Sequence, residues 1–349
     1  MYKWIFIIWM LALTACTNKS SENAVATDSD TIIPVQFTDT ELLAFLDSIH
    51  ELSAEPWIKT ASTLPDSVYN NVLNLNVSIH TSDFELLKRQ VSRSKLSVDL
   101  FRKLVPNAAQ LLPDSIKTPI NAILHSFSAT TFNFFAVELF PDTWESTVLF
   151  FNKNKLLAVH RIFHKYGLEM NYFEGENQLP TVYYRQNFES GTGIWWWNYN
   201  FFAFTEQKLV PVLNELQNAN YQFPWGLRAF WFETTVVETK PLTLKMVYDA
   251  QLWNLENDAE PWHLFSDSCK LTYHWNNKLL RYEPDFSNST LNRTKITSFY
   301  LTGSEELFIN AYYTELKALL SGADTLKQRA IFKYLNEVKN GRQTAEIEF

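Results

Sequence analysis

The feature that most constrains this chain is an aromatic run near its centre. Between Trp195 and Phe204, seven of ten residues are aromatic. Side chains alternate between the two faces of a β-strand. The odd positions would therefore form an unbroken apolar face, whereas the even positions include Asn198 and Asn200. Aromatic residues favour pleated, half-buried surfaces, so this run is predicted to be a strand with its odd face in a core.

A second interpretation makes the even face a ligand-binding platform formed by Trp196, Asn198 and Asn200. An indole ring provides rigid contact area, and side-chain amides provide adaptable hydrogen bonds. Such a platform would suit a sugar or a peptide. Five more tryptophans could join Trp196 around a sugar site: Trp225, Trp231, Trp253, Trp262 and Trp275.

The region 127–302 has the alternating pattern of strands separated by turn residues. Hairpins are predicted with turns at 152–154, 205–207 and 276–277, because asparagine tolerates tight turns. The connections are too short for crossover helices. The sequence therefore predicts an α+β fold with an antiparallel meander of eight to ten strands. Further strands are expected at 181–187, 228–237, 242–249 and 294–302.

Helices are predicted on both sides of this β region. In residues 37–126, capping boxes begin at Thr38 and Ser82. A Leu-Pro-Asp-Ser segment occurs at 64–67 and again at 112–115, which indicates an internal duplication of a helix–loop–helix unit. Residues 73–80 fit either a strand or a helix.

The C-terminal region 303–349 is predicted to hold helices that pack on the sheet. Ser304 and Asp324 are expected to cap helices that end at Gly322 and Gly341. Their apolar stripes need a partner surface. The last four residues, 346–349, fit a short edge strand.

The first sixteen residues have a basic start, an apolar stretch from Trp4 to Leu13, and then Thr14, Ala15 and Cys16. Ten apolar residues are too few to span about 30 Å of hydrocarbon, so this segment is interpreted as a signal peptide. The ending Leu13-Thr14-Ala15-Cys16 resembles the lipobox of bacterial lipoproteins.

This resemblance implies that residues 1–15 are removed and that Cys16 becomes the acylated, membrane-bound N-terminus. Several acyl chains together hold a protein firmly to a bilayer. Residues 16–36 would then form a flexible tether. In that family, Thr17 after the cysteine implies delivery to the outer membrane of a Gram-negative bacterium. Membrane lipid is therefore the expected partner of Cys16.

Charge and motif content exclude several functions. The net charge is −8, and no Lys/Arg cluster accompanies the aromatic residues, which argues against a nucleic-acid partner. Cys16 and Cys269 have no metal or redox spacing. His160 and His164 could share a face, but a zinc site needs a third ligand, so no metal or other cofactor is predicted. The sequence contains none of the usual hydrolase, phosphate-loop or dinucleotide motifs, and no catalytic residue is assigned.

Carboxylates near the aromatic run leave a hydrolase open as an alternative. Cleavage of a glycosidic bond needs two opposed carboxylates. The candidates are Glu174, Glu176, Glu189, Glu233 and Asp249. The favoured interpretation is a lipid-anchored protein that binds a glycan or protein ligand. The alternatives are an envelope hydrolase acting on carbohydrate or cell-wall polymer, and a structural subunit of a membrane assembly. The sequence specifies no oligomeric state.

Overall fold

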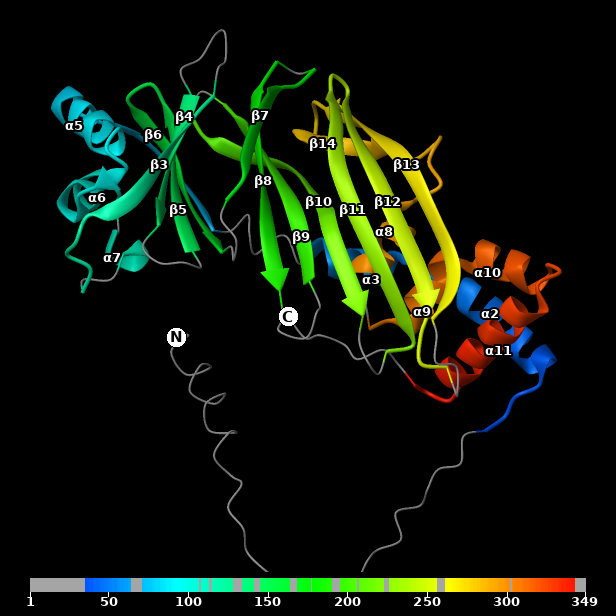
Figure 1. Ribbon diagram of the computed structural model, residues 1–349. Coiled ribbons are helices and arrows are strands. Elements are labelled where there is room, and N and C mark those ends of the chain that lie inside the picture. The colour runs from blue at the N-terminus through cyan, green and yellow to red at the C-terminus, as the bar shows by residue number, and fades with distance from the viewer. Residues whose placement is uncertain are drawn as a thin grey trace, which may run out of the picture. The chain divides into compact units, whose positions relative to one another are not determined.

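The computed structural model describes residues 35–63, 71–106, 108–112, 115–127, 134–140, 145–163, 168–176, 178–189, 195–205, 207–222, 226–255, 261–301 and 303–342. From Gln36 onward these belong to one unit. Its strands form two antiparallel sheets of six and eight strands, with helices towards both ends of the chain (Figure 1). The predicted α+β class is confirmed. The signal peptide, Cys16 and nearly all of the predicted tether lie outside the described residues.

The six-stranded sheet has the order β1-β6-β5-β4-β3-β2. Helices α5, α6 and α7 cover one of its faces (Figure 1) through a core that includes Leu87, Phe101 and Phe151. The bounds are β1 Val72–Ser78, β2 Lys95–Leu96, β3 Ile120–Ser126, β4 Phe134–Phe140, β5 Glu145–Asn152, β6 Lys155–Phe163, α5 Thr81–Val91, α6 Val98–Leu104 and α7 Ala108–Leu111.

The eight-stranded sheet has the order β14-β13-β12-β11-β10-β9-β8-β7, which is a pure meander. The predicted meander is therefore correct, although the strands divide into two sheets. The bounds are β7 Met170–Glu174, β8 Pro180–Glu189, β9 Trp195–Phe204, β10 Leu209–Gln222, β11 Arg228–Thr239, β12 Leu242–Leu252, β13 Trp262–Asn276 and β14 Arg281–Asp285.

The predicted hairpins are present with small shifts. β5 and β6 pair up to Asn152 and Lys155, and Lys153 in the turn has a φ of 55°. β9 and β10 pair from Phe204 and Leu209. β14 begins at Arg281, so the turn after β13 is longer than the sequence indicated.

The two sheets share an aromatic core. Phe202 and Phe204 of β9 are fully buried with Phe134 and Phe150 of the six-stranded sheet. The ring centroids of Phe134 and Phe204 are 4.4 Å apart. Both faces of β9 are thus buried at its C-terminal end, because Phe201 belongs to a separate core on the other side. This explains why the aromatic run is apolar on even as well as odd positions.

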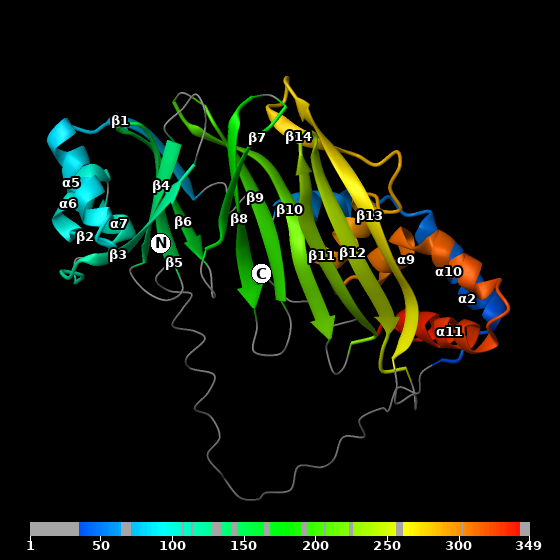
Figure 2. The same cartoon turned by 45° about the horizontal axis from the view of Figure 1, so that its top comes forward.

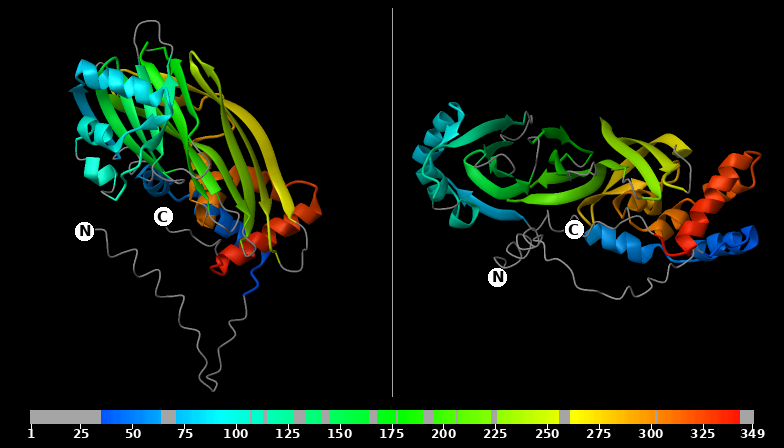
Figure 3. Two further views of the ribbon diagram at one scale, coloured as in Figure 1. Left: turned by 60° about the vertical axis from the view of Figure 1, so that its left-hand side comes forward. Right: turned by 60° about the horizontal axis from the view of Figure 1, so that its bottom comes forward.

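The other helices lie against one face of the eight-stranded sheet. Figure 1 shows α3, α8 and α9 behind its strands, and Figure 2 shows α2, α10 and α11 gathered beside β12 and β13. Viewed from below (Figure 3, right), blue α3 and orange α8 lie on the same side of the strands. The bounds are α2 Asp39–His50, α3 Glu55–Thr63, α8 Arg293–Tyr300, α9 Glu305–Ala311, α10 Tyr313–Leu320 and α11 Thr325–Lys339.

The segment 294–302 was predicted to be a strand, and this prediction is wrong: the chain forms α8 there. The side chain of Asn292 caps the helix by accepting a hydrogen bond from the Lys295 amide. Ile296, Phe299 and Tyr300 then fall on one buried face. Packing of that face against the sheet outweighs the β-propensity of these residues.

The N-terminal region contains strands as well as helices. β1, β2 and β3 lie within residues 37–126, where a helical region was expected. The capping box of Thr38 and Glu41 is present. The second was misplaced, because α5 begins at Thr81 and its cap is His80.

The two halves of the suggested duplication have different partners. α2 packs with α9 and α11, and the Phe37 amide donates to Asn336 at 3.0 Å. α5 packs on the six-stranded sheet instead. The first Leu-Pro-Asp-Ser segment, and Pro113 and Asp114 of the second, lie outside the described residues.

The C-terminal caps are confirmed. Ser304 and Asp324 accept hydrogen bonds from the amides of Leu307 and Lys327. The single helix expected between Ser304 and Gly322 is divided at Tyr312 into α9 and α10. The short strand expected at 346–349 lies outside the described residues.

Candidate functional site

A pocket of about 750 Å³ lies between α3, β10, β14 and α8. This volume is within the range of about 300–1,000 Å³ that is usual for small-molecule sites. Its apolar wall includes Ile58, Ala61, Val212, Leu213 and Phe286. Its polar groups include Asn214, Glu215, Arg281, Glu283, Arg293 and Tyr300.

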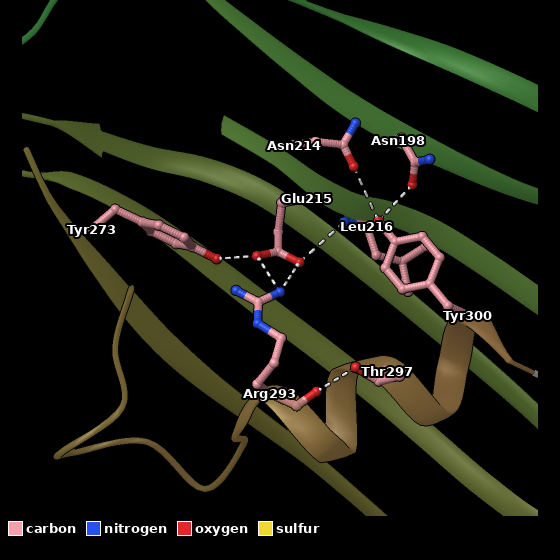
Figure 4. A network of polar contacts seen from close by, with 8 residues as sticks. All are labelled: Asn198, Asn214, Glu215, Leu216, Tyr273, Arg293, Thr297 and Tyr300. Carbon is pink, nitrogen blue, oxygen red and sulfur yellow. Dashed lines mark hydrogen bonds and ion pairs between the residues drawn. The ribbon is translucent and has the colours of Figure 1, made fainter. Parts of the chain in front are cut away.

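Glu215, a buried carboxylate, lines this pocket, and Figure 4 shows its hydrogen-bond partners. Glu215 has no exposed surface. The Tyr273 hydroxyl donates to it at 2.7 Å, and Nη1 of Arg293 donates to both of its oxygens at 3.2 Å. The Leu216 amide adds a third donor at 3.3 Å. A carboxylate with three donors is a stable, preorganised element.

Features of the local sequence determine where Glu215 and Arg293 lie. Glu215 lies in a segment of β10 bounded by two register shifts, at Pro211/Leu213 and Leu216/Asn218. Such irregularities re-aim side chains next to functional sites. Arg293 is the first residue of α8, which the Asn292 cap fixes in position.

A second hydrogen-bond network joins α8 to β9 and β10 (Figure 4). The Tyr300 hydroxyl donates to Asn198 at 2.8 Å and lies 3.5 Å from the Asn214 amide oxygen. Asn214 donates through Nδ2 to Asn200 at 2.5 Å. These bonds connect the helix wall of the pocket to its strand wall.

The residues of the predicted platform therefore have different environments. Asn200 is fully buried, and within the described part of the chain its Nδ2 has no hydrogen-bond partner. Asn198 is half-buried and bonded to Tyr300. The side chain of Trp196 lies outside the described residues. A ligand-binding platform formed by Trp196, Asn198 and Asn200 remains a prediction.

The electrostatics of the pocket are balanced. Burial alone lowers the pKa of Arg293, but attraction to Glu215 and neighbouring tyrosines raises it above its usual value. Burial, with Glu215 nearby, raises the pKa of Tyr273 well above its usual value. Hydrogen bonds from Asn276 and Arg281 lower the pKa of Glu283. Two arginines and two glutamates line the pocket, so their formal charges cancel.

This arrangement suits binding better than acid–base catalysis. Glu215 is occupied by internal donors, and Glu283 is held in its ionised form, whereas a general acid needs a raised pKa. The two carboxylates of the pocket are not among those nominated from the sequence. Of the nominated ones, Glu233 and Asp249 lie on adjacent strands, β11 and β12, away from this pocket.

Other candidate groups are accounted for by packing. His160 is fully buried and hydrogen-bonded to Tyr184, whereas His164 lies outside the described residues. Cys269 is a free, half-buried thiol that accepts a hydrogen bond from Ser289 at 3.5 Å. Among the described residues, no cluster of three His, Cys, Asp or Glu side chains could hold a metal.

Sequence reasoning missed Glu215, Arg293 and Tyr273. One signal was available: Glu215 is a single charge within Val212-Leu213-Asn214-Glu215-Leu216, a largely apolar strand segment. Buried charges of this kind need partners. The partners come from segments 58 and 78 residues further along the chain, which spacing alone could not reveal.

No family model, no curated protein and no solved structure matches the chain. Among the described helices, none is both long enough and apolar enough to cross a membrane.

Proposed function

We propose that this protein is a lipid-anchored binding protein of the bacterial cell envelope, and that the pocket between α3, β10, β14 and α8 holds its ligand. The observation that carries the proposal is the combination of a pocket of about 750 Å³ with a preorganised Tyr273–Glu215–Arg293 network, of which Glu215 and Arg293 line the pocket. The lipid anchor at Cys16 rests on the lipobox resemblance.

The lining indicates a small ligand without net charge. An apolar wall favours burial of a hydrocarbon or ring surface. Arg293 uses only Nη1 for Glu215; the described residues provide no hydrogen-bond partner for its Nε or Nη2. With a third of its side chain exposed, Arg293 can donate to an oxygen of the ligand.

The test uses a matched pair of substitutions. Ser62 is exposed, lines the pocket from α3 and donates to the carbonyl oxygen of Lys59. Ser48 is exposed on α2, outside the pocket, and donates to Phe45 in the same i−3 manner. Ser62→Trp fills the pocket, whereas Ser48→Trp is the control. Full-length protein would be purified from its own membranes, and bound small molecules quantified after denaturation by mass spectrometry.

We expect one compound to co-purify with the wild type and with Ser48→Trp, and to fall at least tenfold in Ser62→Trp. Equal amounts in all three proteins, or no bound compound in any of them, would contradict the proposal.

A further inference from the structure

A second surface lies where β10 and β11 present side chains that point away from α8. Ala219 and Tyr221 of β10, and Phe230 and Phe232 of β11, face the core that contains Phe299 of α8. Neighbours in a strand point to opposite faces. The intervening residues of β10 and β11 therefore point away from α8, on the face in front of the helices in Figure 1.

Cross-strand register places two rows of side chains on this outer face. In the first row, Trp195, Asn220, Trp231 and Asp249 are direct partners on β9, β10, β11 and β12. In the second row, the partners are Trp197, Asn218, Glu233 and Val247. Residues directly opposite one another share a face, so three indole rings lie among amides and carboxylates.

Side-chain contacts hold two of the indoles in place, and all three remain partly accessible to solvent. Trp195, Trp197 and Trp231 are all partly exposed. Nε1 of Trp195 donates to Asn218 at 2.7 Å, and the Arg185 guanidinium lies 4.8 Å from the Trp197 ring.

Strand spacing sets the distances between the three indole rings. Trp195 and Trp231 are two strands apart, or about 10 Å, and Trp195 and Trp197 are about 7 Å apart along one strand. These separations allow one oligosaccharide lying across the sheet to contact more than one indole ring.

Hydrogen-bonding groups surround the rings. Asp249 accepts from Gln251 at 2.9 Å and is paired with His263 at 2.9 Å. His263 is exposed. A sugar needs both an aromatic surface for its C–H face and amides or carboxylates for its hydroxyls.

The charged side chains of this face indicate whether an extended ligand should be neutral or charged. Arg185 is paired with Glu169 at 3.0 Å, and His263 with Asp249. Within the described part of the chain, Glu233 has no ion-pair partner. The exposed Lys245 of β12 offsets Glu233. The face therefore has no positive excess to attract a polyanion, and a neutral chain suits it best.

We infer that the outer face of β9–β12, centred on Trp195, Trp197 and Trp231, is a binding site for a neutral oligosaccharide or polysaccharide. The site is distinct from the pocket, because none of these residues lines the pocket. It involves the aromatic run identified in the sequence, but through odd-numbered tryptophans that were expected in the core.

The test is retention of the full-length protein, in mild detergent, on immobilised neutral glycans: β-glucan, α-glucan, mannan and chitin oligosaccharides. An acidic polysaccharide and an unfolded polypeptide complete the panel. Trp231→Ala removes one ring, and Asp249→Asn removes a charge with almost no change of shape. Trp57→Ala, in a partly exposed tryptophan of α3, is the control, and circular dichroism verifies that each variant is folded.

We expect binding to at least one neutral glycan that is unchanged between low and high salt. Trp231→Ala and Asp249→Asn should each weaken it at least tenfold, whereas Trp57→Ala and the pocket-filling Ser62→Trp should leave it intact. Binding only to the acidic polysaccharide or the polypeptide, failure to bind any panel member, or full binding by a folded Trp231→Ala would overturn the inference. The pocket proposal has its own readout and does not depend on this result.

Discussion

The strongest energetic prediction concerns the ion pair of Glu215 and Arg293. Arg293→Met removes the guanidinium but keeps the length of the side chain. Glu215 is then a fully buried carboxylate, and among the described residues only Tyr273 and the Leu216 amide remain as donors. Breaking a buried ion pair from one side costs about 3–5 kcal/mol. Arg293 is 33% exposed, so we expect the lower end, about 3 kcal/mol.

A double-mutant cycle separates the pair from its neighbours. Glu215→Gln leaves Arg293 able to reach water, so this change should cost less, about 1–2 kcal/mol. Adding Glu215→Gln to Arg293→Met removes the stranded charge and should recover about 1–2 kcal/mol. The assay is urea unfolding followed by tryptophan fluorescence, with each free energy of unfolding obtained by linear extrapolation.

Arg281→Met is the control, because its pair with Glu283 is 3.1 Å long but 58% and 40% exposed. It should change stability far less than Arg293→Met. If the two arginine substitutions have equal effects, or if the cycle shows no coupling, Glu215 is not the preorganised anchor described above.

Three further results are expected. Burial raises the pKa of Tyr273, Tyr312 and Tyr334 well above the usual value of 10.0; the stability linked to these groups is complete below pH 10 and decreases above it, because only the unfolded chain then ionises. A urea-midpoint titration from pH 8 to 11.5 should show that decline, and a flat profile would argue against neutral buried phenols. Phe299→Ala, at a side chain only 3% exposed, should cost about 3–5 kcal/mol in the same assay, and a loss under 1 kcal/mol would mean that α8 is not packed on the sheet. Cys16→Ser should leave the protein unprocessed or released from membranes, whereas full retention after a carbonate wash would contradict lipid anchoring.

The sequence was sufficient for the features that depend on local pattern. The period of two predicted β9 and its neighbours, and the caps at Thr38, Ser304 and Asp324 marked helix starts. Each of these signals is contained within a few residues, where side-chain alternation or a capping hydrogen bond decides the outcome.

Features that depend on tertiary contacts could not be predicted from the local sequence pattern. Residues 293–300 have β-branched and aromatic side chains, yet they form a helix because the sheet offers a surface for Ile296 and Phe299. The pocket assembles residues from α3, β10, β14 and α8, whose meeting no spacing rule predicts. On β9, the odd-numbered Trp195 and Trp197 were expected in the core. Their direct partners on β10 are Asn220 and Asn218, and both tryptophans are partly exposed.

The most direct measurement of the central claim is the native mass of the protein isolated from its own membranes. The account predicts a chain that begins at Cys16, increased by the mass of its acyl chains, and a second peak for the same chain with one small, non-covalent ligand that disappears on denaturation. An intact leader, an unmodified Cys16, or a single peak that is unchanged on denaturation would contradict it.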